Sequence, residues 1–286
     1  MTQTALKFLY AHSPSLFAKE QLFLDVDSKQ VEYLDTKAEE VLLLWCRQSG
    51  KTTSSAAKAV HHTSFQEDAL ALIASASQKQ AAILQTRALN MIRKMNRKND
   101  WRKKDEVYGR ETNPLTGETE LVRQAVMSLQ MANGSEIISV PASPETVRGY
   151  SPTLIILDEA AWMGDEVYIA IRPMRAVTHA QLVCSSSAGM QMGWFYDAWH
   201  ANDDPTVHKI EVLAKDCPRI TPEFLKQEQM KIPETMYRRE YLNEFLAPEG
   251  GLFTEEDIKG MELDDMGLEA IARPWVPDDL SVDVYE

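Results

Sequence analysis

One short segment constrains the fold of this chain more than any other. Residues 41–45, VLLLW, form a continuous apolar run of the kind that becomes a buried parallel strand. The loop CRQSGK follows, and TTSSAAKAVHH after it has helical character. A strand, a loop ending in Gly-Lys-Thr and a helix form the context that a phosphate-binding loop requires. The segment therefore predicts an α/β fold with a nucleotide site at one end of a sheet.

The loop departs from the usual phosphate-loop pattern at one position. That pattern is G-x-x-x-x-G-K-[ST], and Trp45 stands where its first glycine is expected. If the loop binds a nucleotide, backbone N–H groups of residues 46–51 surround the phosphates. Lys51 then supplies a cation, the Thr52 hydroxyl ligates Mg²⁺ and Gly50 permits close approach of the backbone. A Gly-Lys-Thr triplet alone is also compatible with an ordinary strand–helix turn.

Other apolar runs predict the rest of the sheet. Alternating strands and helices indicate an α/β fold with a mostly parallel sheet flanked by helices. In such sheets ligands bind beyond the carboxyl ends of the strands, where SGKT, Asp-Glu and Ser-Ser-Ser fall in this sequence. The expected strands lie at 41–45, 69–75, 135–142, 153–162 and 180–189, and the expected helices at 29–40, 52–62, 78–98 and 193–199. The turn-rich stretch 99–120 predicts a surface excursion.

Two adjacent acids follow an apolar run in LIILDEAAW. Asp158 and Glu159 are poor strand residues and costly to bury unless they are paired. They fit a site in which Asp158 faces Mg²⁺ through its water shell and Glu159 orients an attacking water. By itself, an apolar run ending in Asp-Glu is more often a strand that leads into a solvated turn. Together with the upstream Gly-Lys-Thr, it predicts nucleotide hydrolysis.

A serine triplet and an upstream glutamine fit the same site. Ser185, Ser186 and Ser187 end the next expected strand, where hydroxyls could bond the terminal phosphate or its water and report hydrolysis to the chain. A serine-rich turn explains them equally well. Gln30 lies upstream of the loop, where an amide could recognise the adenine edge, although a single glutamine is more often a surface residue.

Several arginines have alternative interpretations. Arg148, beside a glycine in TVRGYS, suits a finger that completes a neighbour's active site, or a surface ion pair. Arg47, inside the loop, could contact phosphate or fold back to brace the loop. The group Arg238, Arg239, Glu240 and Glu244 predicts a helix surface.

Charge is unevenly distributed along the chain. The net charge of −13 argues against a protein that coats nucleic acid by bulk electrostatics. The basic stretch 87–110, with Trp101 and Tyr108, could contact DNA phosphates, but a solvated helix face followed by a charged loop is the favoured interpretation. No run of eighteen apolar residues and no signal peptide is apparent. Three cysteines without metal-ligand spacing fit a reducing cytoplasm.

Taken in order, these motifs resemble the large terminase subunit of tailed bacteriophages, which packages DNA into empty capsids. The segments are WCRQSGKTT, TVRGYSPTLIILDEAAWM, LVCSSSAGMQMGWFYDAW, CPRITPEFL and YRREYLNEF, and the resemblance covers about residues 30–253. The family's phosphate loop often lacks the first glycine and carries Arg-Gln before Gly-Lys-Thr, as Arg47 and Gln48 do here. Trp45 therefore supports the resemblance to this family rather than arguing against nucleotide binding. The resemblance implies an α/β P-loop NTPase of the RecA/ASCE-like type.

The resemblance also implies roles for individual residues. ATP and Mg²⁺ are the implied ligands, with Thr52 and Asp158 at the metal, and Lys51, Glu159 and Arg148 in catalysis. Arg148 resembles the trans-acting arginine finger. Residues implied in nucleotide binding and coupling are Gln30, Arg47, Gln48, Ser49, Gly50, Lys51, Thr52, Thr53, Ser185, Ser186 and Ser187.

Partners and location follow from the same resemblance. A trans-acting finger implies a ring of subunits, in the family a pentamer docked on the portal protein. Double-stranded viral DNA and the small terminase subunit are the other implied partners. The implied location is the host cytoplasm, with transient residence at the portal vertex of the procapsid.

One departure from the family concerns the end of the chain. We expect residues 1–250 to form the ATPase domain and 251–286 an acidic linker or tail. The family's second, nuclease domain has a ribonuclease-H-like fold and needs on the order of a hundred residues, more than follow Leu246. SVDVYE at 281–286 could be its first strand, with Asp283 as its first acid, or simply a tail. We expect no nuclease activity in this chain, which could be truncated, the product of a split gene, or a natural variant.

A DNA-packaging motor ATPase is the function that the sequence favours, and two alternatives stay open. A helicase-like DNA-dependent ATPase usually binds ATP between two such domains, and this chain has room for one. A non-hydrolysing module that docks on the portal or the small terminase is suggested by the missing nuclease.

Overall fold

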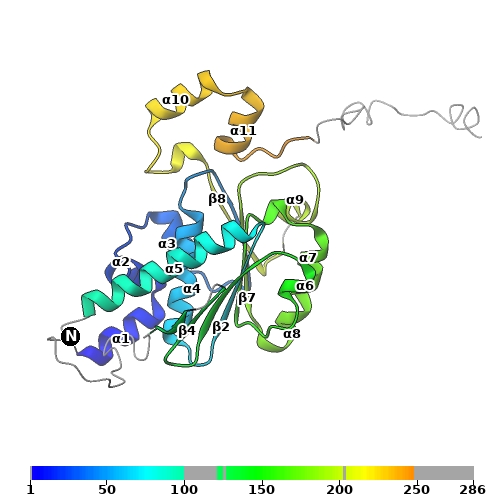
Figure 1. The fold of residues 1–286 in the computed structure, drawn as a ribbon. Coiled ribbons are helices and arrows are strands. Elements are labelled where there is room, and N and C mark those ends of the chain that lie inside the picture. Colours follow the sequence, from blue (N-terminus) through cyan, green and yellow to red (C-terminus); the bar gives the residue numbers. More distant parts are fainter. Residues whose placement is uncertain (1, 100–120, 125–126, 202–203, 248–286) are drawn as a thin grey trace, which may run out of the picture. The chain divides into compact units, whose positions relative to one another are not determined.

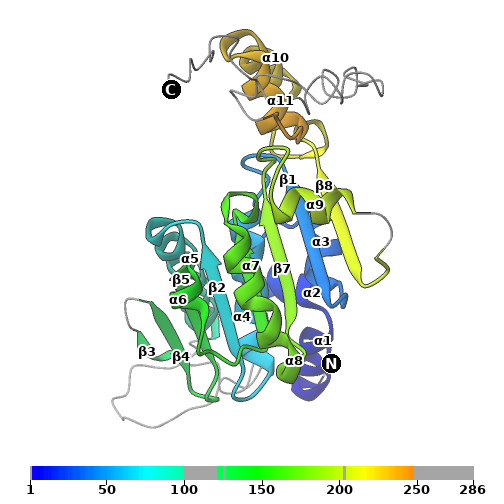
Figure 2. The ribbon, with the colours of Figure 1, turned by 90° about the vertical axis from the view of Figure 1, so that its right-hand side faces the viewer.

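The computed structural model describes residues 2–99, 121–124, 127–201 and 204–247. They form a twisted eight-stranded sheet with helices on both faces (Figure 1). The strand order is β3-β4-β5-β2-β6-β7-β1-β8, with β8 at one edge and β3 at the other (Figure 2). In this order, the six strands β5, β2, β6, β7, β1 and β8 pair in parallel, and β3 and β4 add an antiparallel edge. The predicted fold class is confirmed.

All five expected strands are present, and three more complete the sheet. The strands are β1 (Glu40–Trp45), β2 (Leu70–Ser75), β3 (Leu121–Gln124), β4 (Ser128–Met131), β5 (Glu136–Pro141), β6 (Leu154–Asp158), β7 (Gln181–Ser186) and β8 (Val207–Val212). Sequence analysis missed β3, β4 and β8. β3 and β4 are only four residues long, and β8 carries Lys209 and Glu211 among its apolar residues, so none of them has the continuous apolar run of a central strand.

Helices cover both faces of the sheet, as a parallel sheet requires. They are α1 (Gln3–His12), α2 (Pro14–Glu20), α3 (Ser28–Asp35), α4 (Lys51–Phe65), α5 (Gln78–Asn99), α6 (Pro144–Val147), α7 (Asp165–Ile171), α8 (Arg175–Thr178), α9 (Trp194–His200), α10 (Pro222–Lys231) and α11 (Glu234–Leu242), with short 3₁₀ turns η1 (Ala160–Trp162), η2 (Arg172–Met174) and η3 (Ala214–Asp216). Helices α1 to α5 pack on one face and α6 to α9 on the other (Figure 1).

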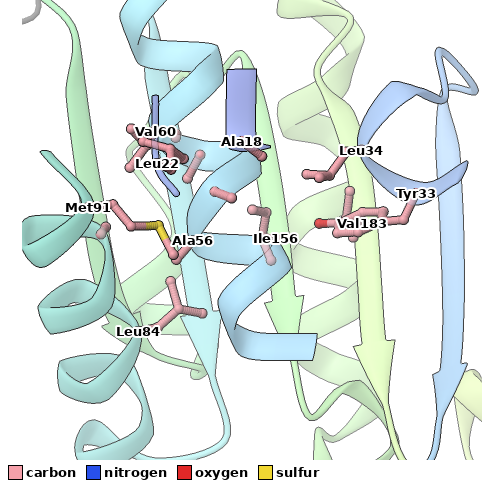
Figure 3. Close-up of a cluster of buried hydrophobic side chains, with 14 of the residues drawn as sticks. Ala18, Leu22, Tyr33, Leu34, Ala56, Val60, Leu84, Met91, Ile156 and Val183 are labelled. Atoms are coloured by element: carbon pink, nitrogen blue, oxygen red, sulfur yellow. The ribbon is translucent and has the colours of Figure 1, made fainter. Parts of the chain in front are cut away.

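Alternate residues of each central strand belong to two separate hydrophobic cores, one on each face of the sheet. Leu43 and Trp45 of β1 face the α1–α5 side, whereas Leu42 and Leu44 belong to the core beneath α6, α7 and α9. Figure 3 shows part of the first core, where side chains from α4 and α5 meet those of the strands. Because both faces are buried, β1 reads as a continuous apolar run rather than an alternating one.

Several expected elements end earlier than predicted, among them the strand expected at 180–189, which ends at Ser186, and the aromatic helix confirms its prediction. The helix expected at 29–40 ends at Asp35, since Thr36 is extended and Glu40 already begins β1. The strand expected at 153–162 ends at Asp158 and continues as the turn η1. The aromatic helix expected at 193–199 is α9, whose Trp194 and Phe195 are buried in the core.

Some predictions fall outside the described residues, among them the surface excursion, apart from its first residue, and the acidic tail at 251–286. Within the described part of the chain, no helix is long and apolar enough to cross a membrane. The three cysteines are buried free thiols.

Candidate nucleotide-binding site

The loop between β1 and α4 turns sharply at the carboxyl end of the sheet. Cys46 extends β1 by donating its backbone N–H to Val212 of β8 at 2.9 Å. Gln48 and Gly50 then take left-handed conformations, with φ of 62° and 94°. The buried Ser49 hydroxyl donates back to the Cys46 carbonyl at 2.7 Å. The loop thus doubles back before α4 begins, which leaves the first N–H groups of that helix for a ligand.

Gly50 suits the left-handed backbone conformation at this position and also has a close neighbour. A Cβ at this position would lie 2.5 Å from Nε2 of Gln30. Gln30 is buried in α3, where its side-chain oxygen accepts the Asp27 N–H at 3.1 Å in a capping box. The structure therefore brings the predicted adenine-reading residue to the loop. It also gives that side chain a structural role which the sequence analysis did not foresee.

Arg219, between η3 and α10, fastens this corner of the loop. Its guanidinium donates to the Ser49 carbonyl, to the Asp27 carboxylate at 2.8 Å and to Gln30 at 3.4 Å. Sequence analysis did not single out Arg219. The contact joins residues 170 positions apart, so no local pattern could have identified it.

Lys51 directs its charge into the loop. Its buried ammonium donates to the carbonyls of Trp45 at 2.8 Å and Cys46 at 3.4 Å. Within the described residues it forms no ion pair. A buried cation satisfied only by carbonyl groups is costly, and an anionic ligand at the loop would offset that cost. Lys51 therefore fits its predicted role toward phosphate.

The adjacent strand ends supply a row of polar groups. Ser75, Asp158 and Ser185 lie in register on β2, β6 and β7. The Ser185 hydroxyl donates to Asp158 at 2.9 Å. Burial and the neighbouring Glu159 raise the pKa of Asp158 to about 6, although Ser185, Lys51 and Arg87 act in the opposite direction. The Ser75 hydroxyl, which sequence analysis overlooked, is buried without a hydrogen-bond partner among the described residues.

Glu159 occupies a sharp turn immediately after β6. It has a left-handed conformation with φ of 63°, a strained geometry for a residue other than glycine. The Ser186 hydroxyl lies 3.5 Å from its carboxylate and accepts the Ala161 N–H at 3.2 Å. The three serines thus differ, because Ser185 bonds Asp158, Ser186 contacts Glu159 and Ser187 lines a cleft.

That cleft joins the loop to the acidic strand end. It has a volume of about 340 Å³ and opens to solvent. The lining residues are Arg47, Lys51, Ala76, Gln80, Glu159, Trp162, Ser187 and Glu240. Lys51, Glu159 and Ser187, predicted from separate motifs, therefore share one space. Thr52 and Thr53 lie beside it in the first turn of α4.

Helix α11 contacts the loop, so the expectation of a plain helix surface at Arg238–Glu244 is wrong for two residues. The Arg47 N–H donates to the Glu240 carbonyl at 3.0 Å, and its guanidinium lies 3.6 Å from the Glu240 carboxylate. Arg239 lies over the Trp162 ring at 5.6 Å. Arg47 braces the loop against α11 in this structure, with a side chain that is 70% exposed.

Arg148 lies outside the cleft. It follows α6, is exposed, and forms no ion pair within the described residues. The surface ion pair considered from the sequence is therefore absent from the described part of the chain. Sequence and structure both leave this arginine available to another subunit.

The described residues contain no group of three or more His, Cys, Asp or Glu that could hold a metal. Magnesium at a nucleotide site does not need such a group, since it keeps several waters and takes one or two carboxylates together with substrate phosphates. Asp158, buried and with a single hydroxyl donor, together with Thr52 at the helix start, fits that sparser requirement.

A parallel sheet with a phosphate-type loop and an acid pair on a neighbouring strand end defines the class of P-loop ATPases. The chain belongs to a particular family within it. Residues 42–260 match the family described as terminase large subunit, T4-like-virus type, N-terminal. The family resemblance drawn from the motifs is confirmed, and it identifies a DNA-packaging motor ATPase.

Solved structures support the same fold. The large terminase ATPase domain of Thermus phage P74-26 is 19% identical with a TM-score of 0.67, and the match covers 82% of this chain and 99% of that one. The HK97 bacteriophage large terminase is 17% identical with a TM-score of 0.62, covering 82% and 55%. An ADP complex of a thermophilic bacteriophage large terminase is 14% identical with a TM-score of 0.56, covering 77% and 54%. No curated protein matches the chain.

Proposed function

We propose that this chain hydrolyses ATP and that hydrolysis drives double-stranded DNA into a procapsid. The observation that carries the proposal is the shared cleft, in which Lys51 of the loop and Glu159 of the acidic strand end meet. Large terminases solved in complex with ADP and with ATP-γ-S support a nucleotide as the ligand.

The loop residues bind the phosphates in this proposal. Backbone N–H groups of Gln48, Gly50 and Lys51 and the start of α4 face the phosphate oxygens, where helix geometry favours an anion. The N–H groups of Cys46, Arg47 and Ser49, which the sequence also predicted to face phosphate, donate to carbonyl groups of the protein instead. Lys51 exchanges its carbonyl partners for those oxygens. Gln30, held beside Gly50, is placed to recognise the base.

Catalysis depends on the two acids. When bound, a Mg²⁺ held by Thr52 and Asp158 neutralises charge that develops on the phosphates. Glu159 orients the attacking water and accepts its proton, and the Ser186 hydroxyl, 3.5 Å from that carboxylate, helps to orient it. Ser187 lines the same cleft, where its hydroxyl reports the state of the terminal phosphate.

Assembly completes the proposed site. Arg148 enters the site of a neighbouring subunit in a ring, for which a pentamer on the portal protein is the proposed arrangement. The small terminase subunit and viral DNA are the other proposed partners. The proposed setting is the host cytoplasm, with transient docking at the portal vertex.

The test is ATP hydrolysis with and without double-stranded DNA by the wild type, Lys51→Ala and Glu159→Gln. Lys29→Ala, which removes an exposed lysine paired with Glu32 on α3, is the matched control. We expect DNA-stimulated turnover in the wild type and control, and a loss of at least about a hundredfold in both site variants. Wild-type turnover no greater than that of the site variants would sink the proposal. Nucleotide binding without any turnover, with DNA and portal present, would favour the non-hydrolysing docking module.

The trans role of Arg148 has its own test. Arg148→Ala and Lys51→Ala subunits are each expected to be inactive alone. Mixed rings contain some interfaces with an intact finger and an intact loop, so mixing is expected to restore part of the activity. Failure to complement, with ring assembly shown to be intact, would assign Arg148 to its own subunit.

A further inference from the structure

A cation from α5 reaches the first turn of α4. Arg87 donates from Nη1 to the Thr53 hydroxyl at 2.6 Å. Its neighbours fix its direction, because Leu84 and Ala88 are fully buried. Figure 3 shows Leu84 and Met91 of α5 directed toward Ala56 of α4. Arg87 therefore lies at the edge of a packed helix pair, with its guanidinium toward the nucleotide site.

The hydrogen bond leaves the Thr53 hydroxyl available as a donor. A hydroxyl that accepts from a guanidinium retains its own hydrogen, and the described residues contain no acceptor for it. Thr53 lies in the first turn of a fifteen-residue helix, where backbone N–H groups and the helix dipole favour an anion. A hydroxyl polarised by a positive charge is a stronger donor than an isolated one. The ligand that suits this position is a phosphate group.

The charge of Arg87 also extends into the site. It is one of the groups that oppose the upward pKa shift of the buried Asp158 carboxylate. The sequence placed Arg87 at the start of the basic stretch 87–110, whose possible roles were a solvated face or a DNA contact. Its hydrogen bond to Thr53 indicates a role for Arg87 other than these two.

We propose that Arg87 is a positioning residue of the nucleotide site, which holds the Thr53 hydroxyl as a hydrogen-bond donor to a phosphate of the bound nucleotide. This inference rests on the nucleotide binding in the proposed function, and it does not depend on hydrolysis or DNA movement. It assigns Arg87 to nucleotide binding rather than to DNA binding.

The test is equilibrium binding of ADP and ATP-γ-S by the full chain with Mg²⁺. Arg87→Ala and Thr53→Val are each expected to weaken binding by about tenfold, since each breaks the proposed chain of hydrogen bonds from Arg87 through the Thr53 hydroxyl to the phosphate. The double variant is expected to bind no more weakly than Thr53→Val alone, because Arg87 acts through the hydroxyl. Arg87→Lys is expected to recover part of the loss, and Thr53→Ser to keep the sensitivity to Arg87. Lys94→Ala, an exposed lysine further along α5, is the control and is expected to bind normally.

Three results would overturn the inference. Equal factors of loss for Arg87→Ala in the wild-type and Thr53→Val backgrounds would show that the two residues act independently. Unchanged nucleotide binding by Arg87→Ala, with weaker binding of a DNA duplex, would return Arg87 to the basic stretch. A lowered thermal unfolding midpoint in Arg87→Ala, with normal nucleotide affinity, would make its role structural. Failure of the proposed function looks different, since the wild type and Lys51→Ala would then bind nucleotide equally poorly.

Discussion

Two buried acids at opposite ends of the sheet have very different surroundings. Glu40 begins β1 at the amino end and accepts hydrogen bonds from Arg172 and Arg175, each at 2.8 Å, and from Tyr168 at 3.1 Å. Asp158 ends β6 at the carboxyl end and accepts one side-chain hydrogen bond, from Ser185. Both are nearly inaccessible, at 6% and 3% exposure.

The difference separates an acid that holds the fold from one prepared for a ligand. Glu40 ties α7 and the following residues to β1, and its charge is balanced by two guanidinium groups. Asp158 has no such balance, and burial raises its pKa. A buried carboxylate that lacks a cation is unfavourable unless something supplies the missing charge. A cation bound at the carboxyl end, as proposed for Mg²⁺, would relieve that cost.

The largest expected effect is the loss of activity in Asp158→Asn. The amide keeps the size of the side chain but removes the charge proposed to hold Mg²⁺. We expect ATP turnover to fall by about 10²–10³, since a bound metal contributes several kcal/mol to the transition state. Steady-state hydrolysis at saturating ATP and Mg²⁺ measures it. Turnover within about threefold of the wild type would show that Asp158 is another structural acid.

Glu40→Gln is expected to act on stability instead. It leaves Arg175, which is only 16% exposed, without its carboxylate, and we expect a loss of about 3 kcal/mol in the free energy of unfolding. Urea unfolding measures the loss, and Glu39→Gln, an exposed neighbour, is the matched control. Turnover per folded molecule should be unchanged. If Glu40→Gln is as stable as the wild type, Glu40 does not hold the fold, and the contrast with Asp158 is wrong.

The pH dependence of stability sharpens the comparison. The pKa of Asp158 is raised from 3.8 to about 6, so folding takes up a proton between these values and the acid destabilises the fold as pH rises through 6. His61 and His62, whose pKa values burial lowers to about 4, act in the opposite sense over the same range. The contribution of Asp158 must therefore be isolated by substitution.

We expect metal-free Asp158→Asn to be more stable than the wild type by about 2–3 kcal/mol at pH 7.5 and equal to it near pH 4. Unfolding by urea in the presence of a chelator, at pH 4, 5, 6 and 7.5, gives the difference at each pH. A constant difference would mean that Asp158 does not titrate in this range in the folded chain.

Sequence patterns anticipated the parts of the site that lie in continuous segments. The apolar run before SGKT and the run before Asp158 each identified a strand and the polar group at its end, because a parallel sheet places such ends along one edge. That argument extended to Ser185, which does bond Asp158. It also gave the class of fold, since five of the eight strands are apolar runs.

Contacts between distant segments could not be anticipated in the same way. Ser75 becomes part of the row of polar groups at the strand ends only because β2 pairs with β6, and the strand order is not encoded in either strand alone. Glu240 and Arg239 looked like surface residues because α11 is polar, yet the helix packs against the loop. Lys51 was predicted to bind phosphate, but its bonds to the loop carbonyls depend on the exact course of the loop.

The smallest expected effect concerns Arg219, whose hydrogen bonds join α3 to the phosphate-type loop. Its planar fork bonds Asp27, Gln30 and the Ser49 carbonyl together, which lysine cannot reproduce although it keeps the charge. Because its side chain is 38% exposed, we expect Arg219→Lys to lose only about 1 kcal/mol of unfolding free energy. Nucleotide affinity should fall about threefold to fivefold, since the loop and Gln30 lose a common anchor.

Isothermal titration with ADP and urea unfolding measure the two effects of Arg219→Lys, with Lys226→Arg on the neighbouring helix α10 as the control. If Arg219 anchors the loop, Gln30→Ala should make the variant's affinity loss smaller, because one of the anchored groups is already gone. Full affinity with reduced stability would place Arg219 with Glu40, as a group that holds the fold. Reduced affinity with full stability would place it with Asp158. The loss of both together is what a residue shared by the fold and the site requires.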